Sequence, residues 1–249
     1  MPRLLPRLLV LALAASCGSP DGEPEVVPAP FEGFCEIEVD GIGTLDLEGD
    51  YLPHVVQCEN GGAGPEALAA QAISARSYAY YKIQTSGRIA DGTSDQVYSC
   101  GKTPALEHVE AVERTRGVVL AYADVPIAAF YVAGAKPSDR ETCVAVAGDD
   151  DPTNTERWVT YNEGRAGNEV EQTPLGWVDP SNVRNRGCMS QWGSRCLEER
   201  GDSFATIARF YYGADIVLAR AEGCAPAPTS FAPPPPGPWS PAMRIGARD

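Results

Sequence analysis

Histidine is scarce in this chain of 249 residues: there are two, His54 and His108. The sequence contains no HExxH zinc motif, no CxxC pair, no GxSxG serine motif and no glycine-rich phosphate loop. We therefore predict neither a metal site nor a cofactor. Ser-His-Asp or Cys-His chemistry would have to use one of the two histidines. We expect His108 to be a solvated helix residue, whereas His54 has the setting to line a cleft.

Basic residues are also few, with 20 Lys and Arg against 34 Asp and Glu, for a net charge of −14. An acidic surface argues against nucleic acid as a partner and against direct binding to an anionic membrane face. The acidic stretch 149–156 resembles half of a calcium loop, but it lacks the central Gly and final Glu of an EF-hand. We expect it to be a solvated acidic loop.

The N-terminal apolar run, 8–15, is too short to span a bilayer permanently and follows two arginines, as in a signal peptide. The Ala-Ala-Ser before Cys17 resembles a lipobox. We therefore predict a lipoprotein signal peptide over 1–16 and a lipid-modified Cys17, which would anchor the protein to a membrane in the periplasm or cell envelope. The alternative is an ordinary signal peptide cut near Ala14 or Ser16. Both interpretations predict export.

The eight cysteines fit an exported protein. Setting aside Cys17 leaves seven, enough for three disulfides and one odd thiol. Cys188 and Cys196 are close in sequence, but on one helix they would be about 12 Å apart, too far for a bond. We expect each to pair elsewhere unless Cys188 precedes the helix.

Composition divides the chain into three further regions. Residues 17–32 are rich in Pro, Gly and acidic residues and are predicted to form a flexible tether. Residues 224–249 contain four consecutive prolines and are predicted to be an extended, disordered tail. The folded domain should therefore occupy residues 33–223, which is within the usual size of one domain.

Hydrophobic periodicity predicts an α+β domain. Alternating residues over 35–48 favour a hairpin, and helices are predicted over 65–82, 103–117, 190–199 and 203–213. In the second of these we expect Leu106, Val109 and Val112 to face inward. Two paired strands are predicted over 118–122 and 127–132. Because the elements do not alternate regularly, we predict mixed helices and antiparallel strands that form a substrate cleft.

Two charged residues stand out as candidates for chemistry. Glu59 lies between an apolar run and a glycine-rich stretch, where desolvation would raise its pKa as a general acid requires. The alternative is an exposed, loop-capping glutamate. Arg76 flanks the alanine-rich stripe of the 65–82 helix, so burial would require a carboxylate partner. The alternative for Arg76 is a purely structural ion pair.

Several blocks of the sequence resemble, in order and rough spacing, the stage II sporulation protein D (SpoIID/LytB) domain. The blocks are 51–59, 65–79, 95–98, 111–120, 127–131, 189–193 and 210–213. The resemblance implies a lytic transglycosylase that acts on the glycan strands of peptidoglycan, best known on strands stripped of stem peptides. It places the catalytic glutamate at Glu59 and a functional arginine at Arg76.

The resemblance also suggests which residues contact the sugars. Those in its substrate-cleft motif are Ser190, Gln191 and Trp192. Three more side chains, suited to hydrogen bonding or stacking on sugars, are Gln71, Gln96 and Tyr98. For each of these the alternative is packing in the core or a loop.

The implied reaction needs only one carboxyl group. The acid protonates the bridging oxygen after N-acetylmuramic acid, and the same group, now a base, deprotonates the C6 hydroxyl of that sugar. The hydroxyl then closes onto C1 and gives a 1,6-anhydro product. No water attacks, so the second carboxylate of an ordinary glycosidase is dispensable.

The chain departs from the family pattern in two segments. Asn185 stands where the family has a histidine, and Ala133-Gly-Ala stands where it often has Ser-Gly-Gly. Cys188 and Cys143 follow these changes, so we expect a disulfide between them and another between Cys58 and Cys100. The departures keep an alternative open, namely a non-catalytic lipoprotein that binds cell-wall glycan or enhances a partner amidase.

Overall fold

The computed structural model describes residues 24–223. The predicted signal peptide (1–16), the lipidation site Cys17 and the predicted tail (224–249) lie outside them. The fold is α+β, as predicted. Among the described residues, no helix combines the length and the apolar character needed to cross a membrane.

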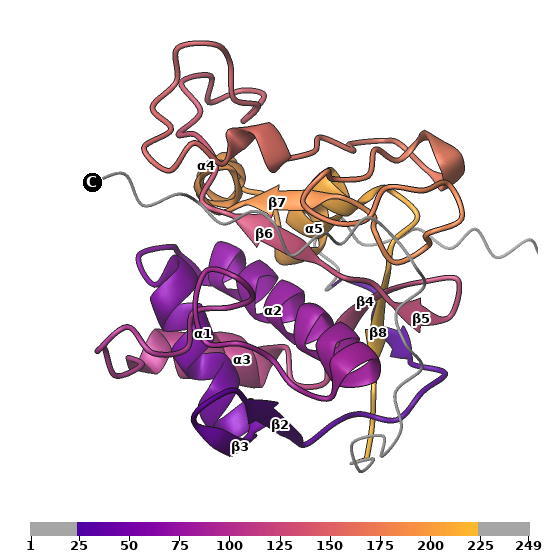
Figure 1. The fold of residues 1–249 in the computed structure, drawn as a ribbon. Helices are drawn as coiled ribbons and strands as arrows, with labels where there is room; N and C mark the ends of the chain where they lie inside the picture. The colour runs from indigo at the N-terminus through magenta and orange to yellow at the C-terminus, as the bar shows by residue number, and fades with distance from the viewer. Residues whose placement is uncertain (1–23, 224–249) are drawn as a thin grey trace, which may run out of the picture.

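Helices and strands follow one another irregularly along the chain (Figure 1). The α-helices are α1 (Leu52–Asn60), α2 (Pro65–Ser86), α3 (Leu106–Arg114), α4 (Gln191–Arg200) and α5 (Phe204–Tyr212). The strands are β1 (Val27–Pro28), β2 (Glu36–Val39), β3 (Gly43–Asp46), β4 (Val118–Tyr122), β5 (Val125–Pro126), β6 (Phe130–Val132), β7 (Cys188–Ser190) and β8 (Val217–Arg220). A π-helical turn, Leu47–Tyr51, leads directly into α1.

The strands form three small sheets. One has the order β1-β8-β4-β5, the second is the antiparallel β2-β3 hairpin, and the third pairs β6 with β7 in parallel. The hairpin confirms the prediction for 35–48. The strand predicted over 127–132 is divided: the Ile127 N–H still donates to the Leu120 carbonyl at 3.0 Å, but Phe130–Val132 pairs with β7 instead.

The predicted tether over 17–32 is wrong for its last part. Val27–Pro28 forms a parallel strand beside β8, and the Ala29 N–H donates to the Arg220 carbonyl at 2.8 Å. The physical reason is that β8 pairs with β4 along one edge and leaves backbone groups available along the other, which an extended segment can satisfy. Composition alone does not reveal such a partner.

Helix α2 runs through the middle of the domain, with α1, α3 and the β2-β3 hairpin on one side and α4, α5, β6 and β7 on the other (Figure 1). Its predicted alanine stripe is buried, and small side chains allow the neighbouring elements to approach closely. The carboxylate of Glu198 in α4 stabilises the first turn of α2, because it accepts hydrogen bonds from the N–H groups of Glu66 (2.9 Å) and Ala67 (3.4 Å). A Cβ at Gly64 would overlap the Glu198 carboxylate, so a larger residue there would have to displace that side chain.

Helix α3 is shorter than the predicted 103–117, and its inward face differs. Val112 is buried as expected, but Leu106 is 69% exposed and Val109 is 38% exposed. The buried face instead carries His108, Ala111 and Val112. The predicted inward face was wrong because His108, a polar residue, was assigned to the solvent-exposed face of the helix.

His108 is buried rather than solvated, because both nitrogens of its ring form hydrogen bonds within the protein. Nδ1 accepts from the Ala105 N–H at 3.0 Å and so caps the start of α3. Nε2 lies 3.1 Å from the Gly61 carbonyl, in the loop that follows α1. Because Nδ1 accepts, the proton belongs on Nε2, which donates to Gly61. His108 thus ties α3 to the glycine-rich loop.

One of the two expected disulfides is confirmed and the other is wrong. Cys58 is bonded to Cys100, whereas Cys143 is bonded to Cys196 and not to Cys188. Cys188 precedes α4 in β7, and it belongs to the same hydrophobic cluster as Phe130, while Cys143 and Cys196 share the other cluster. Cys188 is a buried thiol, and every other cysteine of residues 24–223 is in a disulfide.

Peptide mapping without reduction should recover both bonds and a Cys188 that is alkylated only after denaturation. Replacing Cys58 and Cys100 together by Ser should lower the free energy of unfolding by about 4 kcal/mol, because the bond closes a loop with a separation of 42 residues. Cys188→Ala, which leaves both bonds intact, is the control. A peptide that links Cys143 to Cys188 would contradict the assignment.

Candidate active site

Glu59 lies on the last turn of α1 rather than in a loop. It follows Leu52, Val55 and Val56 at the i, i+3, i+4 and i+7 spacing of one helix face, and those three side chains are fully buried. Glu59 itself is partly buried. The helix therefore carries its carboxyl group from the core to the edge of a polar site.

Both oxygens of the Glu59 carboxyl group are held. Oε1 accepts from the Val97 N–H at 2.8 Å, and Oε2 accepts from Nε2 of Gln191 at 3.0 Å. Burial raises the pKa of Glu59 above its ordinary value, and the two hydrogen bonds offset part of that rise. A larger protonated fraction near neutral pH is what a general acid needs.

Gln96 positions the backbone that contacts Glu59. Its buried amide donates to the Ala75 carbonyl at 3.1 Å and accepts from the Tyr51 hydroxyl at 2.9 Å. These bonds fix the segment beside α2, so the N–H of the next residue, Val97, faces Glu59. The amide of Gln96 is thus committed to the protein itself, which is the packing alternative considered for it.

His54 of α1 and Tyr98 form a partly exposed aromatic pair. The Tyr98 ring stacks on Tyr51 with centroids 5.7 Å apart and contacts the His54 ring at 5.0 Å. Asp50 accepts from the Tyr98 hydroxyl at 3.0 Å and lies 3.0 Å from Nδ1 of His54. Because these rings are partly accessible, they are available to stack on a sugar.

Gln71 and Tyr131 carry buried polar atoms that have no hydrogen bond within residues 24–223. Gln71 lies one turn before Ala75, on the face of α2 that receives Gln96. Burial raises the pKa of Tyr131 well above its ordinary value, the charge of Glu59 adds to the rise, and Gln96 lowers it. Buried polar groups are normally paired, so the Gln71 amide, with both polar atoms unpaired within residues 24–223, is the more available of the two to a bound molecule.

The β7–α4 junction brings the second half of the chain to this site. The Ser190 hydroxyl accepts from the Gly193 N–H at 2.9 Å, so it caps α4. Gly134 packs directly on Ser190 with a φ of +69°, where a Cβ would collide with the hydroxyl. Gln191, the first residue of α4, then reaches Glu59. The Trp192 ring is partly exposed at the same junction.

Arg76 is fully buried, and its carboxylate partner is Glu48. Nε and Nη2 each lie 2.7 Å from an oxygen of Glu48, and Nη1 donates to the Val118 carbonyl at 3.0 Å. Within residues 24–223, Glu59 is not among its hydrogen-bond partners. Glu48 belongs to the π-helical turn that leads into α1, so Arg76 fixes the start of the helix that carries Glu59.

Asn185, at the position where the resemblance implies a histidine, is buried and fully bonded. Its Oδ1 accepts from the Thr173 N–H at 3.0 Å, and its Nδ2 donates to the carbonyls of Thr173 (2.9 Å) and Trp177 (3.0 Å). These bonds close the 173–177 loop onto the segment before β7. The substitution is therefore accommodated as a loop anchor.

Side-chain clusters suited to a metal ion do not occur in the described part of the chain: no three His, Cys, Asp or Glu side chains come together there. In the acidic stretch 149–156, Asp149 and Asp151 accept backbone N–H groups, and Asp150 pairs with Lys136 at 2.7 Å.

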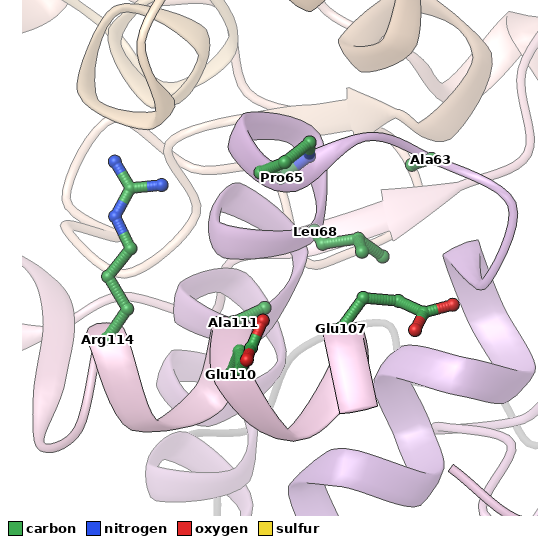
Figure 2. Close-up of a pocket in the computed structure, with 7 residues that line it drawn as sticks. All are labelled: Ala63, Pro65, Leu68, Glu107, Glu110, Ala111 and Arg114. Atoms are coloured by element: carbon green, nitrogen blue, oxygen red, sulfur yellow. The ribbon is translucent and has the colours of Figure 1, made fainter. Parts of the chain in front are cut away.

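A separate cavity of about 230 Å³ lies between the first turn of α2 and the length of α3 (Figure 2). Pro65 and Leu68 of α2 face α3 across it, and its lining residues are Ala63, Pro65, Leu68, Glu107, Glu110, Ala111 and Arg114. Glu59 does not line it, so this cavity is distinct from the carboxyl site.

The fold and the site define an α+β domain in which Glu59, a partly buried and doubly hydrogen-bonded glutamate, lies beside accessible aromatic rings. Residues 37–122 match the model of the SpoIID family, described as stage II sporulation protein. The match is consistent with a SpoIID/LytB family domain and includes Glu59 and Arg76, whereas Gln191 lies beyond it. The search of curated proteins gave no match. The SpoIID family is associated with cell-wall hydrolysis, which suggests a cell-wall-related role.

Sequence analysis missed several residues of this site. Glu48 had no local signal, because it lies 28 residues from Arg76. Val97 contributes only its backbone N–H, which no side-chain pattern reveals. The helical position of Glu59 did have a signal, since the i, i+3, i+4, i+7 pattern is present in the sequence.

Proposed function

We propose that this protein is a peptidoglycan lytic transglycosylase with Glu59 as its single acid and base. The observation that supports this most strongly is the Glu59 carboxyl group itself, which is partly buried, has a raised pKa and is held by Val97 and Gln191. The match to a family associated with cell-wall hydrolysis supports the same substrate class.

In the proposed reaction, protonated Glu59 gives its proton to the glycosidic oxygen as the bond from C1 of N-acetylmuramic acid breaks. The Val97 N–H and the Gln191 amide then stabilise the carboxylate. Glu59 next takes the proton of the C6 hydroxyl while O6 bonds to C1, which restores its starting state. The unpaired groups of Gln71 and Tyr131 would bind polar groups of the sugar, and Tyr98 would stack on it.

A second candidate function is glycan binding without cleavage, or enhancement of a partner amidase. The observation that favours it is Asn185, because a residue bonded only to its own loop supplies no group to the reaction. Mass spectrometry of purified glycan incubated with the protein tests the two. Anhydro-muramic products support the enzyme, whereas binding without them supports the alternative.

We also propose that the protein is exported and held at the cell envelope by a lipid on Cys17, with peptidoglycan strands as its partner. The lipobox-like sequence before Cys17 supports this. Disulfides within residues 24–223 support an oxidising compartment.

The pH dependence of cleavage should respond to Gln191. The rate requires protonated Glu59, so kcat/KM should fall as the pH rises through its pKa. The Gln191 amide lowers that pKa by stabilising the carboxylate, so Gln191→Leu should raise the pKa and move the descending limb to higher pH. Gln57→Leu, on another face of α1, should leave the limb in place. A limb that moves to lower pH in Gln191→Leu would contradict the assignment.

A further inference from the structure

Arg195 of α4 lies near the Glu59 site and has no carboxylate partner among residues 24–223. We infer that its guanidinium binds a carboxylate of the substrate and thereby determines which form of the glycan is accepted. This inference rests on the proposed function and adds a specificity-determining residue to it.

The guanidinium of Arg195 is only partly used by the protein. Nε donates to Oδ1 of Asn60 at 2.8 Å, and the side chain forms no ion pair within residues 24–223. It is partly buried, and loss of solvation lowers its pKa. A guanidinium has five N–H donors in a planar fork, so Nη1 and Nη2 remain available for a bidentate carboxylate.

Two adjacent contacts place Arg195 beside the residue that follows Glu59 in α1. On α4, Gln191 and Arg195 are four residues apart and therefore share a face. Gln191 bonds Glu59 at 3.0 Å, and Arg195 bonds the next residue of α1, Asn60, at 2.8 Å. An anion on the free side of the guanidinium would therefore lie beside the end of α1 that carries Glu59.

The surroundings of Arg195 suit an acidic sugar. Its Cζ lies 4.5 Å from the centre of the partly exposed Trp192 ring, which Lys136 approaches to 4.8 Å. Gly62 lies against the guanidinium, where a Cβ would be 3.5 Å from Nη1, so a larger residue would narrow the approach. The cation–π contact with Trp192 holds the guanidinium in place, and the nearby Lys136 adds a second positive charge that favours an anionic sugar.

Peptidoglycan offers carboxylates from two sources. N-acetylmuramic acid ends its lactyl group in a free carboxylate when no peptide is attached, but this group is an amide when the stem peptide is present. The peptide then carries its own carboxylates further from the sugar. Arg195 bonds Asn60, the residue next to the acid that acts at this same sugar, and this favours the lactyl carboxylate.

Binding measured without cleavage tests the inference. In the Glu59→Gln background, dissociation constants are measured for three soluble glycans: one with free lactyl carboxylates, one with these converted to methylamides, and one with intact stem peptides. We expect the free acid to bind about tenfold more tightly than the methylamide. Adding Arg195→Gln should remove that difference and leave methylamide binding nearly unchanged.

Controls separate the possible outcomes. Arg195→Lys, which keeps the charge without the fork, should retain part of the preference, and Arg140→Gln, at an exposed pair with Glu199, should retain all of it. If Arg195→Gln weakens only the peptide-bearing glycan, the carboxylate is that of the peptide. Equal weakening of acid and methylamide, or none, overturns the role of Arg195 alone. If the protein with Arg195 intact binds no glycan, the proposed function fails as well.

Discussion

Glu59→Gln should abolish the release of 1,6-anhydro products from glycan strands, with a loss of about 10³-fold or more. Glutamine has nearly the same size, and its carbonyl can still accept from the Val97 N–H, so the site should keep its shape. It cannot donate the proton that the leaving oxygen requires, nor remove the proton of the C6 hydroxyl. Mass spectrometry of glycan digests, quantified against time, measures the effect.

The matched control for this substitution is Glu107→Gln, which removes a carboxylate from the separate cavity between α2 and α3. It should release product at the wild-type rate. Product release by Glu59→Gln at that rate would show that another group is the acid. If the wild type binds glycan but releases nothing, the non-catalytic alternative takes the place of the enzyme.

Local patterns predicted the parts of this fold that local interactions stabilise. The alanine stripe of α2, the hairpin over 35–48 and the helix starting at Ser203 all depend on spacing and capping that a sequence displays. Helix α1 was missed although its apolar spacing is present, because Pro53 and His54 gave its first turn the composition of a loop. Pro53 in fact lies in the first turn, where proline is tolerated.

Contacts between distant segments could not be predicted in the same way. Between β6 and β7 the chain runs through a long stretch with little regular structure, held by side-chain bonds to the backbone. Asn162, for example, donates to the Tyr211 carbonyl at 2.8 Å and accepts from the Glu171 N–H at 2.8 Å. Such bonds have no period in the sequence, and the pairing of Cys143 with Cys196 depends on the path they impose.

Arg76 gives the second large effect, and here the expected loss is of stability. Arg76→Met should lower the free energy of unfolding by about 3–5 kcal/mol, because it leaves the Glu48 carboxylate without its partner in the interior. Glu48→Gln should also destabilise, since it leaves the guanidinium uncompensated. Replacing Arg76 by Met and Glu48 by Leu together should cost less than the sum of the single changes, because neither charge then remains alone. Urea unfolding of the three variants measures this.

Activity per folded molecule then distinguishes positioning from catalysis. If Arg76 acts by fixing the π-helical turn before α1, its loss should reduce activity only to the extent that Glu59 is displaced. Glu48→Gln should then reduce activity in the same way. The double variant should recover stability and activity together. An Arg76→Met protein that is stable but inactive, beside an active Glu48→Gln, would instead assign Arg76 a direct role in the reaction. The two hydrogen bonds from the Arg76 guanidinium to Glu48 favour positioning. Glu48 lies in the turn that leads directly into α1, the helix that carries Glu59.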